Sequence, residues 1–284
     1  MTASIIAIVI TYHPPENCIR NILTYYDEVS QIILVDNTEH ENSRFIESLS
    51  SYEKITILKK NINLGIGKAI NLAMEKLLST PCDYILTMDQ DSWFAENEFA
   101  RYVSCIQTLN ISTLGMVGIN YEQTKKENNT GCTPKEASSL ITSGSVFPLQ
   151  AYKTVGKFNE DLFIDGVDHE YCLRLHQQKL QVIWFPEIYL NHNLGTKKEM
   201  RNLGIGKKRL RHIHSPVRLY YITRNYLYLN RIYGKEFPAF CKKLKKEIWV
   251  KLKNGILYEE GKMKYIKYFF KGLGDFRKSR FGPL

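Results

Sequence analysis

The chain has 284 residues, of which 44% are hydrophobic and 24% are charged, so it is long enough for one large domain and too apolar for an intrinsically disordered protein. Its net charge of +10 is unevenly distributed, because residues 1–196 hold 15 Lys and Arg against 23 Asp and Glu (net −8), whereas residues 197–284 hold 24 against 6 (net +18). This split excludes a uniformly basic nucleic-acid binder and indicates an acidic body followed by a basic end that attracts anionic partners.

Membrane-spanning and disulfide-rich proteins are not expected either. No apolar run approaches the roughly 18 residues that a membrane span needs. The apolar start of the chain has no Lys or Arg before it and ends at Pro14-Pro15, which favours a buried strand over an export signal. The six cysteines are scattered without a CxxC pair, so we expect reduced thiols in a cytoplasmic protein.

The first ninety residues alternate strand and helix patterns. Buried strands are predicted at residues 5–11, 32–35, 55–58 and 84–88. Helices are predicted at residues 16–29, around Phe45 to Leu49, and at 65–78. This alternation predicts an α/β fold with a parallel sheet and right-handed crossovers.

The remainder of the chain is less regular. Strands are expected at residues 116–120, 141–147, 182–185 and 188–191, a loop at 123–139, and a helix at 168–178. From Pro216 onward the pattern is helical and amphipathic, with lysines on the polar faces. We therefore expect an α/β domain at residues 1–215, which would hold any active site, and a basic amphipathic helical region at residues 216–284.

Polar residues follow each of the four early strands, where a parallel sheet binds its ligands. They are Thr11-Tyr12-His13, Asp36-Asn37, the segment 61–67, and Asp89-Gln90-Asp91. Any one of these could merely cap the next helix, but four at one sheet edge indicate a site. The two carboxylates of Asp89 and Asp91 suit a hard divalent cation that also binds phosphate oxygens. His192 follows a later strand and is either structural or a further ligand of that cation.

Two further motifs bear on the class of protein and on its chemistry. Gly65-Ile66-Gly67-Lys68 is followed by Ala69 and lacks the dinucleotide spacing, which excludes a P-loop NTPase and an NAD enzyme. The segment 163–174 carries Asp165, Asp168 and Glu170, with Glu170 placed to pair with Arg174 on a helix. The acidic residues either favour the helix N-terminus or supply a general base.

Together these residues resemble the inverting glycosyltransferases of family 2, and within them the bacterial rhamnosyltransferases. The similarity rests on TYHPP, ILVDN, NLGIGKAINLA, TMDQDSWF, TSGS and FIDGVDHEYCLR followed by HNLG, and it spans roughly residues 4–230. It implies a GT-A fold, whose mostly parallel Rossmann-like sheet is flanked by helices, a nucleotide-diphosphate sugar donor, and Mg²⁺ or Mn²⁺ as cofactor.

The resemblance also assigns roles to individual residues. Those that would bind the nucleotide-sugar are Thr11, Tyr12, His13, Asp36, Asn63, Gly65, Asp89 and Gln90. Asp91 would bind the metal, with Asp89 beside it and His192 completing the site. Asp168 matches the catalytic base, and Asp165 is a second candidate because Val167 stands where many relatives carry Glu. Ser143, Gly144 and Glu170 would contact the acceptor.

The expected activity is a single displacement that transfers L-rhamnose from dTDP-β-L-rhamnose to a lipid-linked saccharide in surface polysaccharide synthesis. The alternatives are a same-fold transferase that uses UDP-galactose or UDP-glucose, and a non-catalytic nucleotide-binding protein. For the basic end, solvated lysine faces compete with binding to an anionic membrane surface. No nucleic-acid motif is present, so nucleic acid is not an expected partner. The resemblance favours the membrane, which would hold the enzyme on its inner face.

Overall fold

The computed structural model describes residues 3–40, 43–121, 131–192, 197–202, 205–212 and 214–284. The chain divides into two compact units, which are described separately. The first unit consists of Met1–Asn159 and Asp168–Asn193, and the second consists of Glu160–Val167 and Leu194–Leu284. The predicted boundary at 215/216 therefore falls inside the second unit, which also takes in the short segment before Asp168.

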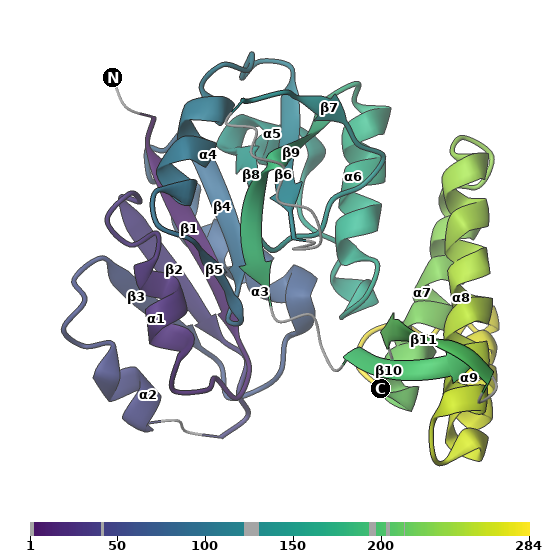
Figure 1. Ribbon diagram of the computed structural model, residues 1–284. Coiled ribbons are helices and arrows are strands. Elements are labelled where there is room, and N and C mark those ends of the chain that lie inside the picture. Colours follow the sequence, from purple (N-terminus) through teal and green to yellow (C-terminus); the bar gives the residue numbers. More distant parts are fainter. Residues whose placement is uncertain (1–2, 41–42, 122–130, 193–196, 203–204, 213) are drawn as a thin grey trace. The chain divides into compact units, whose positions relative to one another are not determined.

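Four parallel strands form one half of the sheet of the first unit, as predicted. They are β1 (Ile5–Thr11), β2 (Gln31–Asp36), β3 (Ile55–Lys59) and β4 (Tyr84–Asp89), in the spatial order β3-β2-β1-β4. Every residue of β1 is buried, which explains its uninterrupted run of apolar side chains. Because all four strands run the same way, their carboxyl ends meet at one edge of the sheet (Figure 1).

The other half of the sheet is mixed. Next to β4 lies the antiparallel strand β8 (Ser145–Pro148), followed by β6 (Leu114–Asn120), β9 (Gln181–His192) and the short β5 (Ser92–Phe94). A two-residue strand, β7 (Lys135–Glu136), pairs with β9. The predicted strand at 141–147 begins only at Ser145, because Gly144 adopts a φ of +75° in the turn before it. The two strands predicted at 182–191 form the single strand β9, whose register with β6 shifts after Ile119.

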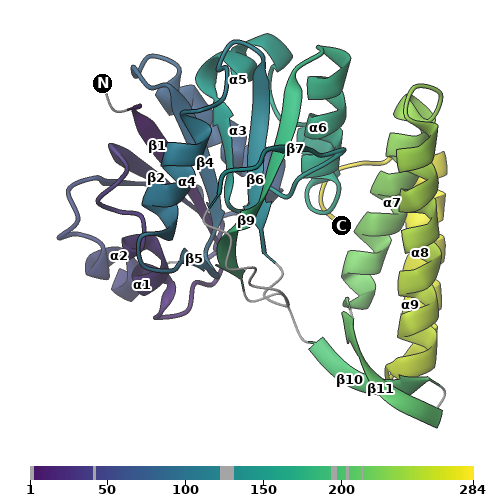
Figure 2. The same cartoon turned by 45° about the horizontal axis from the view of Figure 1, so that its top comes forward.

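Helices pack against both faces of this sheet (Figures 1 and 2). Residues of α1 (Cys18–Leu23), α2 (Ser43–Ser48) and α4 (Glu98–Ile106) share one core with Ile5, Ala7 and Val9 of β1. Helix α3 (Gly65–Leu77) contacts β1 and β2, and α5 (Leu149–Val155) contacts β8 and β6. Helix α6 (Val167–Gln177) follows a single 3₁₀ turn, Glu160–Leu162. The helix predicted at 16–29 is limited to α1, because the Thr24 side chain and backbone both bond to the Asn21 carbonyl.

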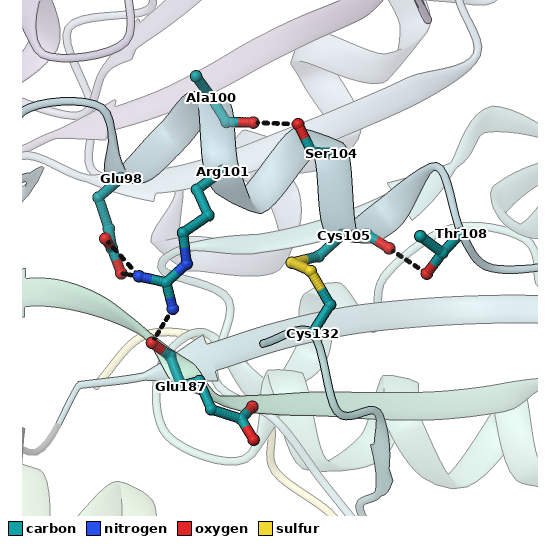
Figure 3. Close-up of a disulfide and its surroundings, with 8 residues drawn as sticks. All are labelled: Glu98, Ala100, Arg101, Ser104, Cys105, Thr108, Cys132 and Glu187. Atoms are coloured by element: carbon teal, nitrogen blue, oxygen red, sulfur yellow. Dashed lines mark hydrogen bonds and ion pairs between the residues drawn. A yellow bond between two sulfur atoms is a disulfide. The ribbon is translucent and has the colours of Figure 1, made fainter. Parts of the chain in front are cut away.

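A disulfide corrects the prediction of six reduced thiols. Cys105 of α4 is bonded to Cys132, with their Cα atoms 5.4 Å apart (Figure 3). The bond crosses a separation of 27 residues, a pairing that no local spacing in the sequence reveals. In the same view, Arg101 of α4 forms an ion pair with Glu98 and donates to the backbone carbonyl of Glu187. The other four cysteines are free thiols.

The described residues of the second unit form a β-hairpin and three α-helices, besides the 3₁₀ turn Glu160–Leu162. The hairpin joins β10 (Lys197–Asn202) to β11 (Ile205–His212), and its strands went unpredicted because both are rich in charged residues. The helices α7 (Pro216–Tyr233), α8 (Pro238–Tyr258) and α9 (Lys262–Arg277) pack on one another, which confirms the helical prediction from residue 216. Within the described residues, no helix combines the length and apolarity that crossing a bilayer requires.

Two buried polar residues of α7 hold the segment 160–167 in this unit. The guanidinium of Arg224 donates to the carbonyls of Asp161, Leu162 and Gly282 and lies over the rings of Tyr220 and Tyr221. The Asn225 amide donates to the carbonyls of Leu162, Ile164 and Asp165, at 2.7 to 2.8 Å. The buried cation thus has several acceptors and an aromatic lining, which offset its loss of water.

Candidate functional site

A buried carboxylate marks one end of the site, at the carboxyl ends of β1 and β2. Parallel pairing sets Thr11 opposite Asp36, and the Thr11 hydroxyl donates to Asp36 Oδ1 at 3.3 Å. The Thr38 amide donates to the same oxygen at 3.1 Å. The second oxygen, Asp36 Oδ2, lies 3.6 Å from Lys59 Nζ and is buried without a hydrogen bond to any described residue. Asp36 is therefore fixed in orientation and keeps one oxygen that a ligand N–H could satisfy.

A cavity of about 420 Å³ opens in the same region of the first unit. Its lining residues are Glu39, His40, Ile46, Lys59 and Asn61. Because Lys59 also reaches Asp36, the cavity and the buried carboxylate share one wall. Lys59 was not among the residues predicted from the sequence, although Lys59 is the last residue of β3 and lies at the same sheet edge as the predicted ones.

Tyr12 and His13 extend from β1 over this region. Tyr12 is partly exposed, and its hydroxyl donates to Glu39 Oε1 at 3.2 Å. Its partial burial and the nearby Glu39 carboxylate both raise the pKa of Tyr12. His13 has a φ of 45°, donates its amide to Thr38 Oγ1, and lies 3.4 Å from Glu39 Oε2. Both rings thus lie beside the residues that surround Asp36.

Gln90, predicted to bind the nucleotide-sugar, forms hydrogen bonds to the chain. Its Oε1 accepts from the Tyr12 amide at 2.7 Å, and its Nε2 donates to the Tyr12 carbonyl at 3.1 Å. The side chain therefore joins the end of β1 to the turn after β4. Gln90 positions Tyr12, and its role as a direct ligand contact stays a prediction.

Asn63 and Gly65 shape the start of α3. Asn63 Oδ1 accepts from the Gly65 amide at 3.0 Å, and Gly65 has a φ of +74°. Asn37, which follows β2, donates to the Gly65 carbonyl and accepts from the Leu64 amide. Two asparagines and one glycine thus hold the loop before α3 against the end of β2, and Asn37 was identified at a strand end without an assigned role.

Three side chains gather at the ends of β4 and β9. The potential ligand atoms of Asp89, Asp91 and His192 all lie within 4.8 Å of one another. His192 Nδ1 is 3.4 Å from Asp91 Oδ1, and it reaches this position because Ser92 of β5 pairs directly with His192 of β9. Burial lowers the pKa of His192, an effect that the Asp91 carboxylate opposes, so its imidazole is neutral near pH 7.

This donor set fits a divalent cation. Two carboxylates and a neutral imidazole are ligands that Mg²⁺ or Mn²⁺ accepts, and carboxylates predominate at sites that also hold phosphate. Asp91 is partly exposed whereas His192 is mostly buried, so the cluster opens on the side of Asp91.

Two buried hydroxyls connect the ends of the cluster through a chain of hydrogen bonds. The Asp89 amide donates to Ser143 Oγ at 3.1 Å, and Ser143 Oγ donates to Ser92 Oγ at 2.7 Å. Ser92 Oγ in turn lies 2.5 Å from His192 Nδ1. The predicted acceptor residue Ser143 thus supports the cluster, and Ser92 is a residue that sequence reasoning missed. No local signal would have found Ser92, because its role depends on the pairing of β5 with β9.

Gly144 follows Ser143 in a tight turn. Its amide donates to the Thr87 carbonyl of β4 at 2.8 Å, and a Cβ at this position would lie 2.8 Å from Leu190 Cδ2 of β9. Only glycine combines a φ of +75° with this close approach. The turn therefore holds Ser143 where its hydroxyl bonds to Asp89 of β4 and Ser92 of β5.

The two candidates for a catalytic base lie in different units. Asp168, in the first turn of α6, accepts from the His169 amide at 2.8 Å and is partly exposed. Asp165 belongs to the second unit, where the Arg218 guanidinium donates to both of its carboxylate oxygens, at 2.6 and 3.2 Å. Asp168 thus remains partly exposed with His169 Nδ1 3.8 Å from its Oδ1, whereas both oxygens of the more buried Asp165 accept from Arg218.

Glu170 is buried and faces Arg174, as its spacing predicted. Arg174 Nε donates to both Glu170 oxygens, and the guanidinium also donates to the carbonyls of Val155 and Lys157. These contacts join α6 to the last residue of α5 and to the segment that follows it. In the structure, Glu170 holds the Arg174 guanidinium in place, and its contact with the acceptor stays a prediction.

Comparisons with known proteins agree with this architecture. The sequence model of Glycosyl transferase family 2 matches residues 8–146, which span the strands from β1 into β8. The dTDP-rhamnosyl transferase RfbF of Shigella flexneri is 32% identical over 248 residues, covering 81% of each chain.

Solved structures share the fold at low sequence identity. GalNAc-T7 with UDP, GalNAc and Mn²⁺ matches with a TM-score of 0.61 at 10% identity, over 98% of this chain and 58% of that chain. Residues 1–349 of S. aureus TarS in complex with UDP-GlcNAc match with a TM-score of 0.59 at 13% identity, over 98% and 81% of the two chains. The chain thus spans little more than half of GalNAc-T7, and these likenesses establish the GT-A fold. Given the extent of the match to RfbF, the chain belongs to glycosyltransferase family 2.

Proposed function

We propose that this glycosyltransferase transfers L-rhamnose from dTDP-β-L-rhamnose to a saccharide acceptor, with inversion at the anomeric carbon. The observation that carries the proposal is the Asp89, Asp91 and His192 cluster at the sheet edge that also holds Asp36. The choice of donor rests on the similarity to a relative named as a dTDP-rhamnosyl transferase, which extends over 81% of both chains.

In this proposal, Asp36 and the cluster bind opposite parts of the donor. The free Oδ2 of Asp36 would accept from the N–H of the nucleobase, while Tyr12 and Asn63 would border the nucleoside. Asp91, Asp89 and His192 would hold Mg²⁺ or Mn²⁺. When bound, that cation offsets the negative charge of the diphosphate leaving group.

Asp168 would act as the general base. As the acceptor oxygen bonds to the anomeric carbon, the bond from that carbon to the diphosphate breaks, and the hydroxyl proton passes to the Asp168 carboxylate. One displacement inverts the carbon, so a β-linked donor gives an α-L-rhamnoside. Asp165 is the weaker candidate because Arg218 occupies both of its oxygens.

A uridine-linked donor is the second candidate, since both structural neighbours described above contain UDP or a UDP-sugar. Thermal unfolding with dTDP, UDP and GDP in the presence of Mn²⁺ separates the two. We expect dTDP to give the largest rise in Tm. In a second assay, we expect the protein to hydrolyse labelled dTDP-rhamnose. A larger rise with UDP, together with hydrolysis of a UDP-hexose, would overturn the dTDP assignment. An Asp91→Ala variant with full activity would overturn the metal site.

The acceptor is proposed to be lipid-linked, with the enzyme attached to the inner face of the membrane through residues 216–284. This part of the proposal is supported by the charge of +18 in residues 197–284, because each Lys or Arg near an anionic surface contributes roughly 1 kcal/mol. Flotation with anionic and neutral vesicles tests the attachment. Equal flotation with both would contradict an electrostatic mechanism.

A further inference from the structure

The three helices of the second unit enclose an apolar groove that has no part in the donor site. Its volume is about 520 Å³, within the roughly 300–1,000 Å³ of pockets that bury a small organic ligand. Every lining residue belongs to the second unit, and only Thr223 and Lys245 are polar. The apolar lining residues are Leu227, Ile248, Trp249, Leu252, Ile256, Ile266, Phe269, Phe270 and Leu273.

Two large aromatic side chains that line this groove are exposed to solvent. Trp249 of α8 is 62% exposed and Phe270 of α9 is 61% exposed, whereas Tyr265 and Phe269 on α9 are buried. The Trp249 and Phe269 rings lie 5.5 Å apart, and Phe269 and Phe270 lie 5.3 Å apart. The aromatic residues of this region therefore divide into core residues and residues that remain available to an apolar ligand.

Lysines flank the exposed aromatic residues on the same helices. Lys242, Lys246 and Lys253 lie one or two turns from Trp249 on α8, and Lys267 lies one turn before Phe270 on α9. All four are exposed. A hydrocarbon slot bordered by ammonium groups matches an amphiphile that carries both an apolar chain and negative charge.

We propose that this groove binds one hydrocarbon chain of an anionic membrane lipid, with the flanking lysines at the headgroups. The charge argues against a second copy of the chain, since a symmetric contact would bring the lysines of both copies together. Trp249 and Phe270 would lie at the level where amphipathic aromatic residues meet the bilayer. The inference rests on the proposed membrane attachment and adds to it a defined site for the lipid chain.

Quenching of Trp249 tests the site directly. Full-length protein is mixed with phosphatidylglycerol–phosphatidylcholine vesicles whose acyl chains carry bromine, and tryptophan emission is compared between the wild type and Trp249→Phe. We expect quenching in the wild type and its loss in the variant. Binding without quenching of Trp249 would mean that the lysines alone attract the vesicle, which would overturn the groove while leaving the attachment intact.

Substitutions at the groove provide the second measurement. Trp249→Ser with Phe270→Ser is expected to weaken binding to anionic vesicles at least about tenfold, or about 1.4 kcal/mol. The matched control is Val250→Ser with Leu257→Ser, which changes two exposed apolar residues of α8 that do not line the groove. We expect the control to bind like the wild type and both double variants to retain donor hydrolysis. Equal binding by both double variants would overturn the inference.

Two further outcomes are distinct. If the wild type binds no anionic vesicle, the proposed attachment fails together with the groove, whereas the donor assays still decide the transferase proposal. If the wild type is a dimer in solution that Trp249→Ser with Phe270→Ser dissociates, a second copy occupies the groove and the lipid assignment is overturned.

Discussion

Replacing Ser92 by alanine is expected to weaken metal binding without removing any metal ligand. The Ser92 hydroxyl accepts from Ser143 at 2.7 Å and lies 2.5 Å from His192 Nδ1. Alanine breaks both contacts and leaves two buried polar groups, Ser143 Oγ and His192 Nδ1, short of a partner. Loss of one such bond costs about 1–3 kcal/mol, and loss of a residue that orients a metal ligand lowers metal affinity roughly 10- to 100-fold.

The assay is the Mn²⁺ dependence of dTDP binding and of dTDP-rhamnose hydrolysis. In Ser92→Ala we expect the half-saturating Mn²⁺ concentration to rise roughly 10- to 100-fold, with kcat largely restored at saturating metal. Ser145→Ala is the matched control, because Ser145 is a buried serine nearby whose hydroxyl donates to the Ile141 carbonyl and has no place in the chain to His192.

A double-mutant cycle with His192→Ala shows whether Ser92 acts through His192. Once the imidazole is gone, the Ser92 hydroxyl keeps its bond from Ser143 but orients no metal ligand directly, so the Mn²⁺ dependence of the double variant should match that of His192→Ala alone. Additive losses, or an unchanged Mn²⁺ dependence in Ser92→Ala, would refute the reasoning.

Four further predictions concern other parts of the molecule. Asp168→Asn should lower kcat roughly 100- to 10,000-fold in steady-state transfer assays, whereas an inactive Asp165→Asn beside an active Asp168→Asn would move the base to Asp165. Asp36→Ala should raise the KM for the donor roughly tenfold or more, because the N–H of the nucleobase loses its acceptor and Lys59 loses its counter-ion. An unchanged KM would mean that the nucleobase binds elsewhere. Gly144→Ala should lower the free energy of unfolding by about 1–3 kcal/mol in a urea titration, since φ is +75° and the new Cβ would lie 2.8 Å from Leu190; a stable variant would contradict that turn. Burial raises the pKa of the Cys18 and Cys172 thiols to about 12, so iodoacetamide at pH 8 should leave both unmodified in the folded protein. Cys105 and Cys132 should become labelled only after reduction and unfolding, because they form a disulfide. Mass spectrometry reads both outcomes.

The sequence by itself determined the parallel half of the sheet. Strands buried on both faces consist of consecutive apolar residues, and such runs stand in the sequence at residues 5–11 and 84–88. Because parallel strands end at the same edge, the polar residues after them could be assigned to one site. Asp36, Asp89 and Asp91 are located at that edge by the order of strands and polar residues alone.

Only the tertiary structure decided which partners reach that edge. His192 joins the two aspartates because β5 pairs with β9 across 100 residues of sequence, and the same pairing makes Ser92 its neighbour. Strand order and such long-range pairings follow from the packing of the whole sheet, so no local spacing encodes them.

The same reason distinguishes Asp168, the first candidate for the base from the sequence, from Asp165, the second candidate three residues before it. Asn225 and Arg218 bind the backbone and side chain of Asp165 within the second unit, while Asp168 lies in the first turn of α6 and belongs to the first unit. The disulfide from Cys105 to Cys132 likewise depends on where α4 lies, and Gln90 turns toward Tyr12 because β1 and β4 are neighbours. Local periodicity fixes elements and their ends, whereas contacts between distant segments exist only once the sheet has formed.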